Sequence, residues 1–255
     1  MDITDIAQVK RDVWGREVLL GVSWDLLWLV VVAAFAVIIV HLIVVTVMKS
    51  DPRPSTGGAR LERHASIDRW FHWITAISIF VLLITGVFPI IGIKFDWLTI
   101  HWIAGLVLTA AVLFHAVRAL FWQNALAMWI APKDLVEPFD ADARPAKYSF
   151  AQKGMHLVMS VLVLAVVVTG VWLLFTIDTP WWERGNQISE ATLGWLFVLH
   201  GLSTLGLVGF TALHMYFALR PEKRFYTRSM LTGWISEHEH VANHDPSRWA
   251  PDKSG

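Results

Sequence analysis

The chain has 255 residues, 55% of them hydrophobic, and its 21 basic and 21 acidic side chains give a formal net charge of zero. This balance argues against nucleic acid as a partner, and a mean hydropathy of +0.51 indicates a membrane protein. The chain has no cysteine, which excludes disulfides, cysteine-ligated iron–sulfur clusters, c-type heme attachment and thiolate zinc sites. A metal would therefore depend mainly on nitrogen ligands.

Five apolar runs are long enough to cross a lipid bilayer as helices. We expect spans over residues 24–47, 71–93, 98–121, 151–177 and 193–219. Many of the 15 tryptophans lie near the ends of these runs, where amphipathic rings anchor at the headgroups. The first run is too long for a cleaved signal peptide and lacks a small-residue cleavage site, so we interpret it as a span.

The second and fourth spans repeat one pattern. His72 is followed 14 residues later by Gly86, His156 is followed 14 residues later by Gly170, and a threonine precedes each glycine. The first span lies outside this repeat. We therefore expect an all-α integral membrane fold in which a four-helix bundle is joined by one extra N-terminal helix. The expected organisation is an N-terminal segment with the extra helix (1–48), the bundle (49–220) and a cytoplasmic tail (221–255).

Basic residues in the loops predict the orientation, because lysine and arginine favour the cytoplasmic side. They gather in two loops and at the start of the tail: Lys49, Arg53, Arg60, Arg63, Arg69, Lys133, Arg144, Lys147, Arg220, Lys223, Arg224 and Arg228. The N-terminal segment fits this orientation less well, because it carries three basic residues, although acidic residues lie among them. We expect the N-terminus outside and the C-terminus in the cytoplasm.

Two spans each carry histidines 14 residues apart, His101 with His115 and His200 with His214. On a helix this separation is about 21 Å along the axis, and both rings point to nearly the same face. Two such helices side by side could hold two hemes between axial imidazoles, one above the other. Intramembrane histidines are costly and usually functional.

The two depths differ in how many histidines they hold. His101 and His200 at the outer depth suffice for one bis-imidazole heme. The inner depth has four: His72, His115, His156 and His214. The surplus could serve the second heme, a quinone pocket or propionate contacts.

The remaining histidines carry less information. His41 lies alone in the first span, where a structural role is expected. The other four occupy polar loop or tail segments, where solvated surface is the default: His64, His238, His240 and His244.

Several motifs together resemble a known family. They are Arg69-Trp-Phe-His72-Trp73, His101 followed by Gly105, Gln152-Lys153 at the start of the fourth span, and His200-x13-His214. Over residues 60–249 the chain resembles the cytochrome b (gamma) subunit of membrane-bound formate dehydrogenase. The wider group includes the cytochromes b of thiosulfate reductase and nickel–iron hydrogenase. That family has four spans, so the extra N-terminal helix is a departure.

The resemblance implies two b-type hemes and a quinone site. The implied iron ligands are His72, His101, His200 and His214. The repeat would instead pair His115 with His214, and we favour His72 because its Arg-x-x-His-Trp context matches the family motif. The implied quinone-site positions are Ser149, Ala151, Gln152, Lys153 and His156, although the family has Asn and Gly in place of Ser149 and Ala151.

The implied function is electron transfer without substrate chemistry on this chain. An iron–sulfur partner subunit, served by a molybdenum or tungsten catalytic subunit, would supply electrons that cross the inner (cytoplasmic) membrane to quinone. The alternatives are the cytochrome b of a nickel–iron hydrogenase or a thiosulfate reductase, and a stand-alone transmembrane electron carrier. A transporter with histidines as a proton relay is an alternative from another class.

Overall fold

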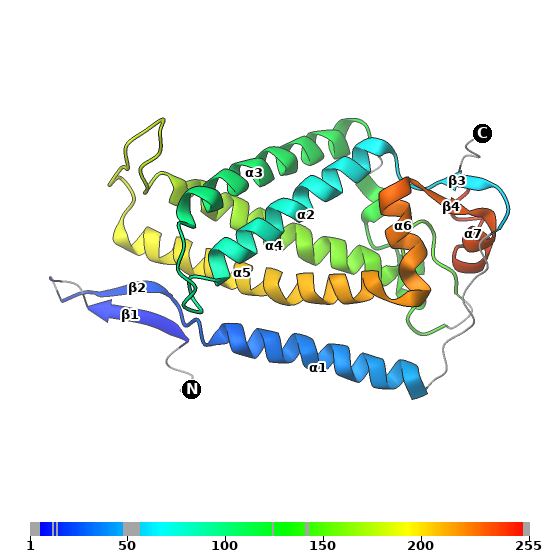
Figure 1. The fold of residues 1–255 in the computed structure, drawn as a ribbon, viewed down its shortest axis with the longest axis horizontal. Coiled ribbons are helices and arrows are strands. Elements are labelled where there is room, and N and C mark those ends of the chain that lie inside the picture. Colours follow the sequence, from blue (N-terminus) through cyan, green and yellow to red (C-terminus); the bar gives the residue numbers. More distant parts are fainter. Residues whose placement is uncertain are drawn as a thin grey trace. The chain divides into compact units, whose positions relative to one another are not determined.

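The computed structural model describes residues 6–11, 13, 15–47, 57–123, 125–140 and 143–251. Five of its helices are long and apolar enough to cross a membrane, which confirms the expected multi-pass helical fold. They are α1 (Leu26–Val47), α2 (Ser66–Val87), α3 (Leu98–Phe121), α4 (Phe150–Leu174) and α5 (Glu190–Leu219) (Figure 1). Lys49 and Arg53, which contribute to the predicted orientation, lie outside the described residues.

The second span differs most from its expected limits. It begins at Ser66 and ends at Val87, whereas the apolar run suggested residues 71–93. Hydropathy misses the polar first turn, where Asp68 complements the positive end of the helix dipole. Pro89 follows the helix and lacks the backbone N–H needed to continue it.

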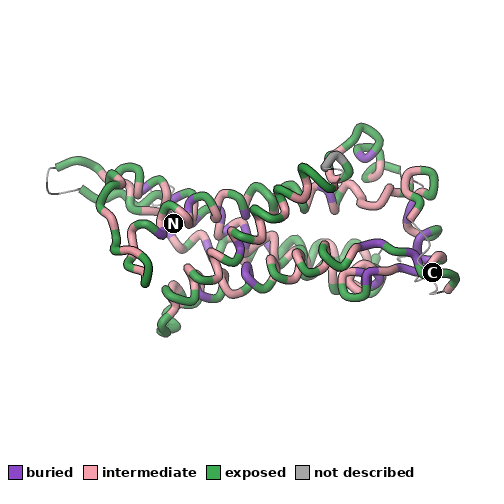
Figure 2. Tube along the Cα trace, turned by 90° about the horizontal axis from the view of Figure 1, so that it is seen from above, coloured by how far each residue is buried: buried purple, intermediate pink, exposed green. Residues whose placement is uncertain are grey.

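The chain divides into two compact units, and each long helix contributes residues to both. Unit 1 comprises residues 1–36, 74–113 and 159–211, and unit 2 comprises residues 37–73, 114–158 and 212–255. Figure 2 shows half-buried and exposed residues along most of the helices. Exposed apolar side chains are expected on helices that face lipid.

Unit 1 has an apolar core supplied by four helices. Its buried members come from α2, α3, α4 and α5: Ile79, Leu108, Val163, Val166 and Leu207. A second cluster joins α5 to the N-terminal segment through Val22, Leu27, Val198 and Leu205. This packing depends on Gly194, because a Cβ there would collide with the carbonyl oxygen of Leu19.

The N-terminal segment of unit 1 contains a β-hairpin that the sequence analysis missed. Strand β1 (Ala7–Arg11) pairs antiparallel with β2 (Glu17–Val22). Helix α1 follows and buries only Leu27 and Ala34. Helix α1 is apolar on all sides, and most of its side chains are exposed. Such a helix suits a lipid environment.

Unit 2 contains a folded C-terminal region. Strand β3 (Arg60–Glu62) pairs with β4 (Trp234–Ser236), and helices α6 (Arg224–Thr232) and α7 (Glu237–Asn243) flank β4. Short 3-10 helices cover Ala125–Met128, Pro132–Val136 and Pro221–Lys223. Gly233 ends α6 with a φ of 93° and donates its N–H to the Ser229 carbonyl. Leu61, Phe225 and Ile235 form the apolar centre.

Candidate functional site

Unit 1 brings together the two histidines that the sequence analysis placed at the outer depth. The ring centroids of His101 on α3 and His200 on α5 lie 6.3 Å apart, and both side chains are half-buried. We call them the α3–α5 pair. Its members are 99 residues apart in the sequence and come from the two halves of the internal repeat.

A threonine holds each ring of the α3–α5 pair. Thr85 Oγ1 lies 2.8 Å from His101 Nδ1, and Thr169 Oγ1 lies 2.8 Å from His200 Nδ1. Each hydroxyl also donates its proton to a carbonyl one turn earlier, at 2.7 Å for Thr85 and 2.6 Å for Thr169. The hydroxyl must therefore accept from the imidazole, so Nδ1 carries the ring proton. The Nε2 lone pair is left to bind a metal.

The glycine after each threonine explains the second half of the repeated motif. A Cβ at Gly170 would lie 3.4 Å from Cε1 of His200, and one at Gly86 would lie 3.6 Å from Cε1 of His101. Each imidazole thus lies directly against the backbone of the preceding helix. The Thr-Gly repeat is a pair of equivalent histidine supports.

Unit 2 pairs the four inner histidines in two sets. His72 on α2 faces His214 on α5 with ring centroids 6.4 Å apart, which we call the α2–α5 pair. His115 on α3 faces His156 on α4, also at 6.4 Å, which we call the α3–α4 pair. His214 therefore faces His72, the partner that the motif favours over His115.

The α2–α5 pair has looser support than the α3–α5 pair. His72 Nδ1 is buried and has no hydrogen-bond partner among the described residues. Trp73 packs edge-on against His72, with ring centroids 5.1 Å apart, and its indole N–H donates to the Met230 carbonyl at 3.1 Å. An orphaned buried nitrogen fits a ring whose other partner is a cofactor.

The spacing of these pairs fits bis-imidazole heme ligation. An imidazole nitrogen binds a transition metal at about 2 Å, so two axial rings place their centroids about 6 Å apart. The α3–α5 and α2–α5 pairs both have this separation. With no thiol in the chain, imidazole nitrogen is the main donor available for the iron.

The predicted quinone-site residues lie at the start of α4, where several of their polar atoms already have partners. The Ser149 N–H donates to Gln152 Oε1 at 2.9 Å, and the Gln152 N–H donates to Ser149 Oγ at 3.3 Å. This reciprocal arrangement is a capping box that satisfies the first turn of the helix. Ala151 is exposed and offers no polar side chain, while His156 belongs to the α3–α4 pair.

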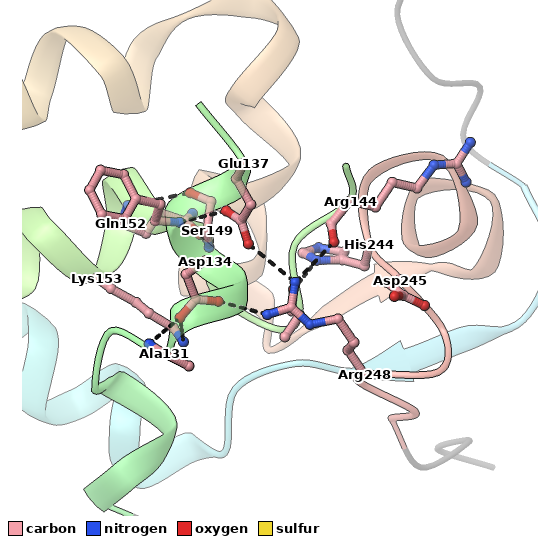
Figure 3. Close-up of polar contacts among 12 residues, drawn as sticks. Ala131, Asp134, Glu137, Arg144, Ser149, Gln152, Lys153, His244, Asp245 and Arg248 are labelled. Carbon is pink, nitrogen blue, oxygen red and sulfur yellow. Dashed lines mark hydrogen bonds and ion pairs between the residues drawn. The ribbon is translucent and has the colours of Figure 1, made fainter. Parts of the chain in front are cut away.

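Lys153, also predicted at the quinone site, belongs to a buried ion network (Figure 3). Its ammonium donates to Asp134 Oδ2 at 2.7 Å and to the Trp129 carbonyl at 3.1 Å, and Arg248 donates to Asp134 Oδ1 at 2.6 Å. Burial alone would raise the pKa of Asp134, but the hydrogen bonds from Lys153, the Ala131 N–H and Arg248 hold it below its ordinary value.

Arg63 is a buried cation. In the sequence it counted only as one of the basic loop residues that predict the orientation. It is 2% exposed, and the ion pairs among the described residues do not include it. It donates to His244 Nε2 at 3.0 Å and to the Lys147 carbonyl at 2.6 Å, and its guanidinium lies 4.6 Å from the Tyr226 ring centroid. Burial lowers the pKa of Arg63.

The expectation of solvated histidines in the loop and tail is wrong for three of the four. His64, His240 and His244 are buried, and His238 is exposed. Burial, with Arg63 second, lowers the pKa of His244 to about 3. The partners of His244 lie 98 and 181 residues away, so local polarity could not reveal them.

His41 anchors α1 within unit 2, consistent with its expected structural role. Its Nδ1 lies 2.9 Å from the Tyr216 hydroxyl and 2.9 Å from an Arg220 amino group. Arg220 in turn pairs with Glu222. These contacts join the extra helix to the end of α5.

A family model described as prokaryotic cytochrome b561 matches residues 63–233. The match includes every histidine of the three pairs and leaves out the β-hairpin and α1. It confirms the cytochrome b resemblance at the level of this broad family. No curated protein matches the chain closely enough to count as a relative. Because the matched residues make up more than half of the chain, it belongs to the prokaryotic cytochrome b561 family, whose members are membrane b-type cytochromes that carry electrons.

Proposed function

We propose that this chain passes electrons across the inner membrane from an iron–sulfur partner subunit to quinone, using b-type hemes at the α3–α5 and α2–α5 pairs. The observation that carries the proposal is the matched ring separation of these pairs, 6.3 and 6.4 Å. When bound, each heme supplies a one-electron iron couple. Reduction of one quinone takes two electrons from the donor and two protons from the cytoplasmic side.

The chain's own contribution at the α3–α5 pair is orientation. Thr85 and Thr169 fix the tautomer of the two imidazoles and raise the basicity of Nε2. Unit 1 also has an apolar core that includes Leu108 at 1% exposure. Such surroundings keep water away from a charged metal centre and help to set its potential.

We place quinone reduction at the start of α4. Gln152 uses its side-chain oxygen in the helix cap, which leaves its NH₂ group to donate to a quinone carbonyl. The Ser149 hydroxyl can donate as well, because Oγ accepts from the Gln152 N–H in the cap. Lys153 contributes by fixing the first turn of α4 against Asp134.

The proposed donor complex is of the formate dehydrogenase type, with a molybdenum or tungsten catalytic subunit. The motif around His72 supports this choice within the broad family. The proposed orientation has the N-terminus outside and the C-terminus in the cytoplasm, because most loop lysines and arginines fall on the C-terminal side of the membrane. The donor would then dock at the outer face.

Affinity purification of the full chain from its native membranes tests the proposal. We expect iron–sulfur and catalytic subunits to copurify, formate to reduce the b-type hemes, and added quinone to reoxidise them. Reduction by hydrogen or thiosulfate chemistry would reassign the donor complex. A chain that purifies alone and is reduced directly by ascorbate would be a stand-alone carrier. A colourless protein would overturn heme binding and favour a transporter.

A further inference from the structure

A group of basic side chains in unit 2 has no part in the function proposed above. It lies around the ring of Tyr148. The Arg63 guanidinium is 5.6 Å from the centroid of that ring, and the Lys147 ammonium is 5.5 Å from it. The ring centroid of His64 is 6.3 Å from the same point. Arg63 and His64 are buried and Lys147 is half-buried. We call Arg63, His64 and Lys147 the basic cluster.

The basic cluster has no carboxylate partner in the ion pairs of the residues that the structure describes. The acidic side chains whose charges reach Lys147 are Asp68 and Glu62. Asp68 already pairs with Arg118, and Glu62 is exposed to solvent. A buried cation without a counter-ion is costly. The cluster is therefore suited to bind an anion that the chain does not supply.

The same part of unit 2 holds N–H donors without acceptors. The Nε atoms of Arg63 and Arg69 are buried and have no hydrogen-bond partner among the described residues. The two amino groups of Arg63 are already used, since they donate to His244 Nε2 and to the Lys147 carbonyl. Guanidinium nitrogens donate and never accept. The missing partner is therefore an acceptor, such as an anionic oxygen.

The end of α6 connects the basic cluster to the α2–α5 pair. The Gly233 carbonyl accepts from the N–H groups of Arg63 and His64 at 2.8 and 3.0 Å. Three residues earlier, the Met230 carbonyl accepts from the indole N–H of Trp73 at 3.1 Å. Trp73 follows the α2 histidine of the α2–α5 pair in the sequence. One short segment thus contacts both the cluster and the neighbourhood of this pair.

His64 lies close to both groups of residues. Its pKa is lowered to about 3, first by burial and then by the charges of Arg63, Lys147, His72 and Arg69. An imidazole that responds to the cluster and to His72 is near both. Because it is neutral at pH 7, it can donate a hydrogen bond without adding a further charge.

The burial of Arg63 decides which anion fits. Arg63 is 2% exposed, and its guanidinium lies 4.6 Å from the Tyr226 ring centroid and 5.1 Å from that of Trp249. A phospholipid headgroup that approached from the membrane surface would meet this aromatic cover. A heme held by the α2–α5 pair presents its carboxylates from inside the bundle, because b-type heme carries two propionate side chains that are anionic at neutral pH.

We propose that the basic cluster binds the propionates of the heme at the α2–α5 pair, an inference that rests on the heme binding proposed for that pair. Arg63 and Lys147 balance the charge of the propionates, and His64 donates a hydrogen bond to them. These side chains are positioning residues. They orient the heme and raise its potential, because a fixed positive charge favours the reduced iron.

Redox titration of the purified full chain tests the proposal. Arg63→Gln and Lys147→Met each remove one positive charge and should lower the midpoint potential of the same single heme. Its ratio of oxidised to reduced iron at a fixed potential should rise about tenfold, which is about 59 mV. Arg63→Lys keeps the charge and should retain most of the potential. The matched control Arg144→Gln also removes an arginine that binds the C-terminal region, through the Val241 carbonyl, and should change neither potential.

Infrared redox-difference spectra identify the bound group directly. With hemes isotopically labelled at the propionate carboxyls, the labelled bands should shift in Arg63→Gln and in Lys147→Met and stay in place in Arg144→Gln. A purely structural role for Arg63 would not move these bands in Lys147→Met. This half-buried lysine also decides the question if Arg63→Gln fails to fold.

Each other outcome has a definite meaning. Unchanged potentials and bands in Lys147→Met, with the hemes still bound, would overturn the proposal and leave the proposed function standing. A phospholipid that copurifies with the wild type and is lost in Lys147→Met, with the bands unshifted, would assign the cluster to a lipid headgroup and overturn it too. Shifted bands in a protein that quinone does not reoxidise would support the cluster and overturn quinone reduction. A protein without heme would overturn both proposals.

Discussion

The two units support their histidines in different ways. In unit 1 a threonine fixes each ring of the α3–α5 pair, and the apolar core lies in the same unit. In unit 2 the Nδ1 of His72 has no partner among the described residues, and elsewhere in the unit Asp134 forms ion pairs with Lys153 and with Arg248 of the C-terminal region. A tightly positioned ligand suits a fixed potential, whereas a less constrained ligand in a unit that also holds polar groups suits exchange of electrons and protons with quinone.

The ion network of unit 2 should give the largest mutational effect. Asp134→Ala leaves the buried ammonium of Lys153 without its carboxylate and should destabilise the fold by about 3–5 kcal/mol. Thermal unfolding of the solubilised protein measures the loss. The double variant Asp134→Leu with Lys153→Met should recover most of it, because an apolar pair replaces the charges.

The proposed difference between the two units would be contradicted if Asp134→Ala weakened heme binding equally in both. We expect the heme of the α2–α5 pair to be lost first on heating and that of the α3–α5 pair to be retained longer. Simultaneous loss of both in the variant would show that the polar network supports the two units equally.

The threonine supports of unit 1 should give the next effect. Thr169→Val keeps the shape of the side chain but removes the acceptor for the His200 Nδ1 proton. Loss of an outer-shell partner costs about tenfold to hundredfold in metal affinity. Heme transfer to apomyoglobin measures this as faster heme loss from one site. Thr169→Ser keeps the hydroxyl and serves as the control. Equal heme loss in both variants would contradict a hydrogen-bonding role.

Acid should destabilise unit 2 through His244. Its folded pKa is about 3, against an ordinary value near 6.5, so the unfolded chain binds a proton first as the pH falls. The stabilisation is complete above pH 6.5 and is lost as the pH falls towards 3, by about 1.4 kcal/mol per pH unit. Arg63, His240 and Lys223 all oppose the charge on His244.

His244→Gln isolates this dependence. The glutamine can donate to the Ala146 carbonyl and accept from Arg63, as the imidazole does, but it does not titrate. Unfolding measured between pH 7 and pH 5 should therefore show a shallower loss of stability in the variant. An unchanged slope would mean that His244 stays neutral in both states or is charged in both.

The sequence predicted the parts of this molecule that depend on periodicity. Five apolar runs gave the five long helices, and the 14-residue spacings gave His101 and His200, which face one another in unit 1. In unit 2 the repeat would have paired His214 with His115, and it was the family motif that favoured His72, the ring that His214 faces. Polar contacts between segments far apart in the sequence could not be predicted. Arg63 was interpreted as a loop charge, since its contact with His244 joins segments 181 residues apart.

The short elements were missed for a related reason. The β3–β4 pairing is only three residues long in each strand, so neither strand has an alternation that a sequence pattern could show. The Thr-Gly repeat was visible in the sequence, but its role required the contact of Thr85 with His101 on another helix. Local patterns identify which residues recur, and the fold determines what they touch.

Gln152 should give the smallest change in stability and the most specific change in function. Gln152→Leu removes both the capping acceptor for Ser149 and the proposed NH₂ donor to quinone. The lost cap costs about 1 kcal/mol. Gln152→Glu keeps the capping acceptor and removes only the donor, so its stability should match the wild type. Both variants should slow heme reoxidation by a soluble quinone about tenfold, which is the loss of one hydrogen bond of about 1.4 kcal/mol. Slow reoxidation in the leucine variant alone would assign Gln152 to the helix cap and remove it from the quinone site.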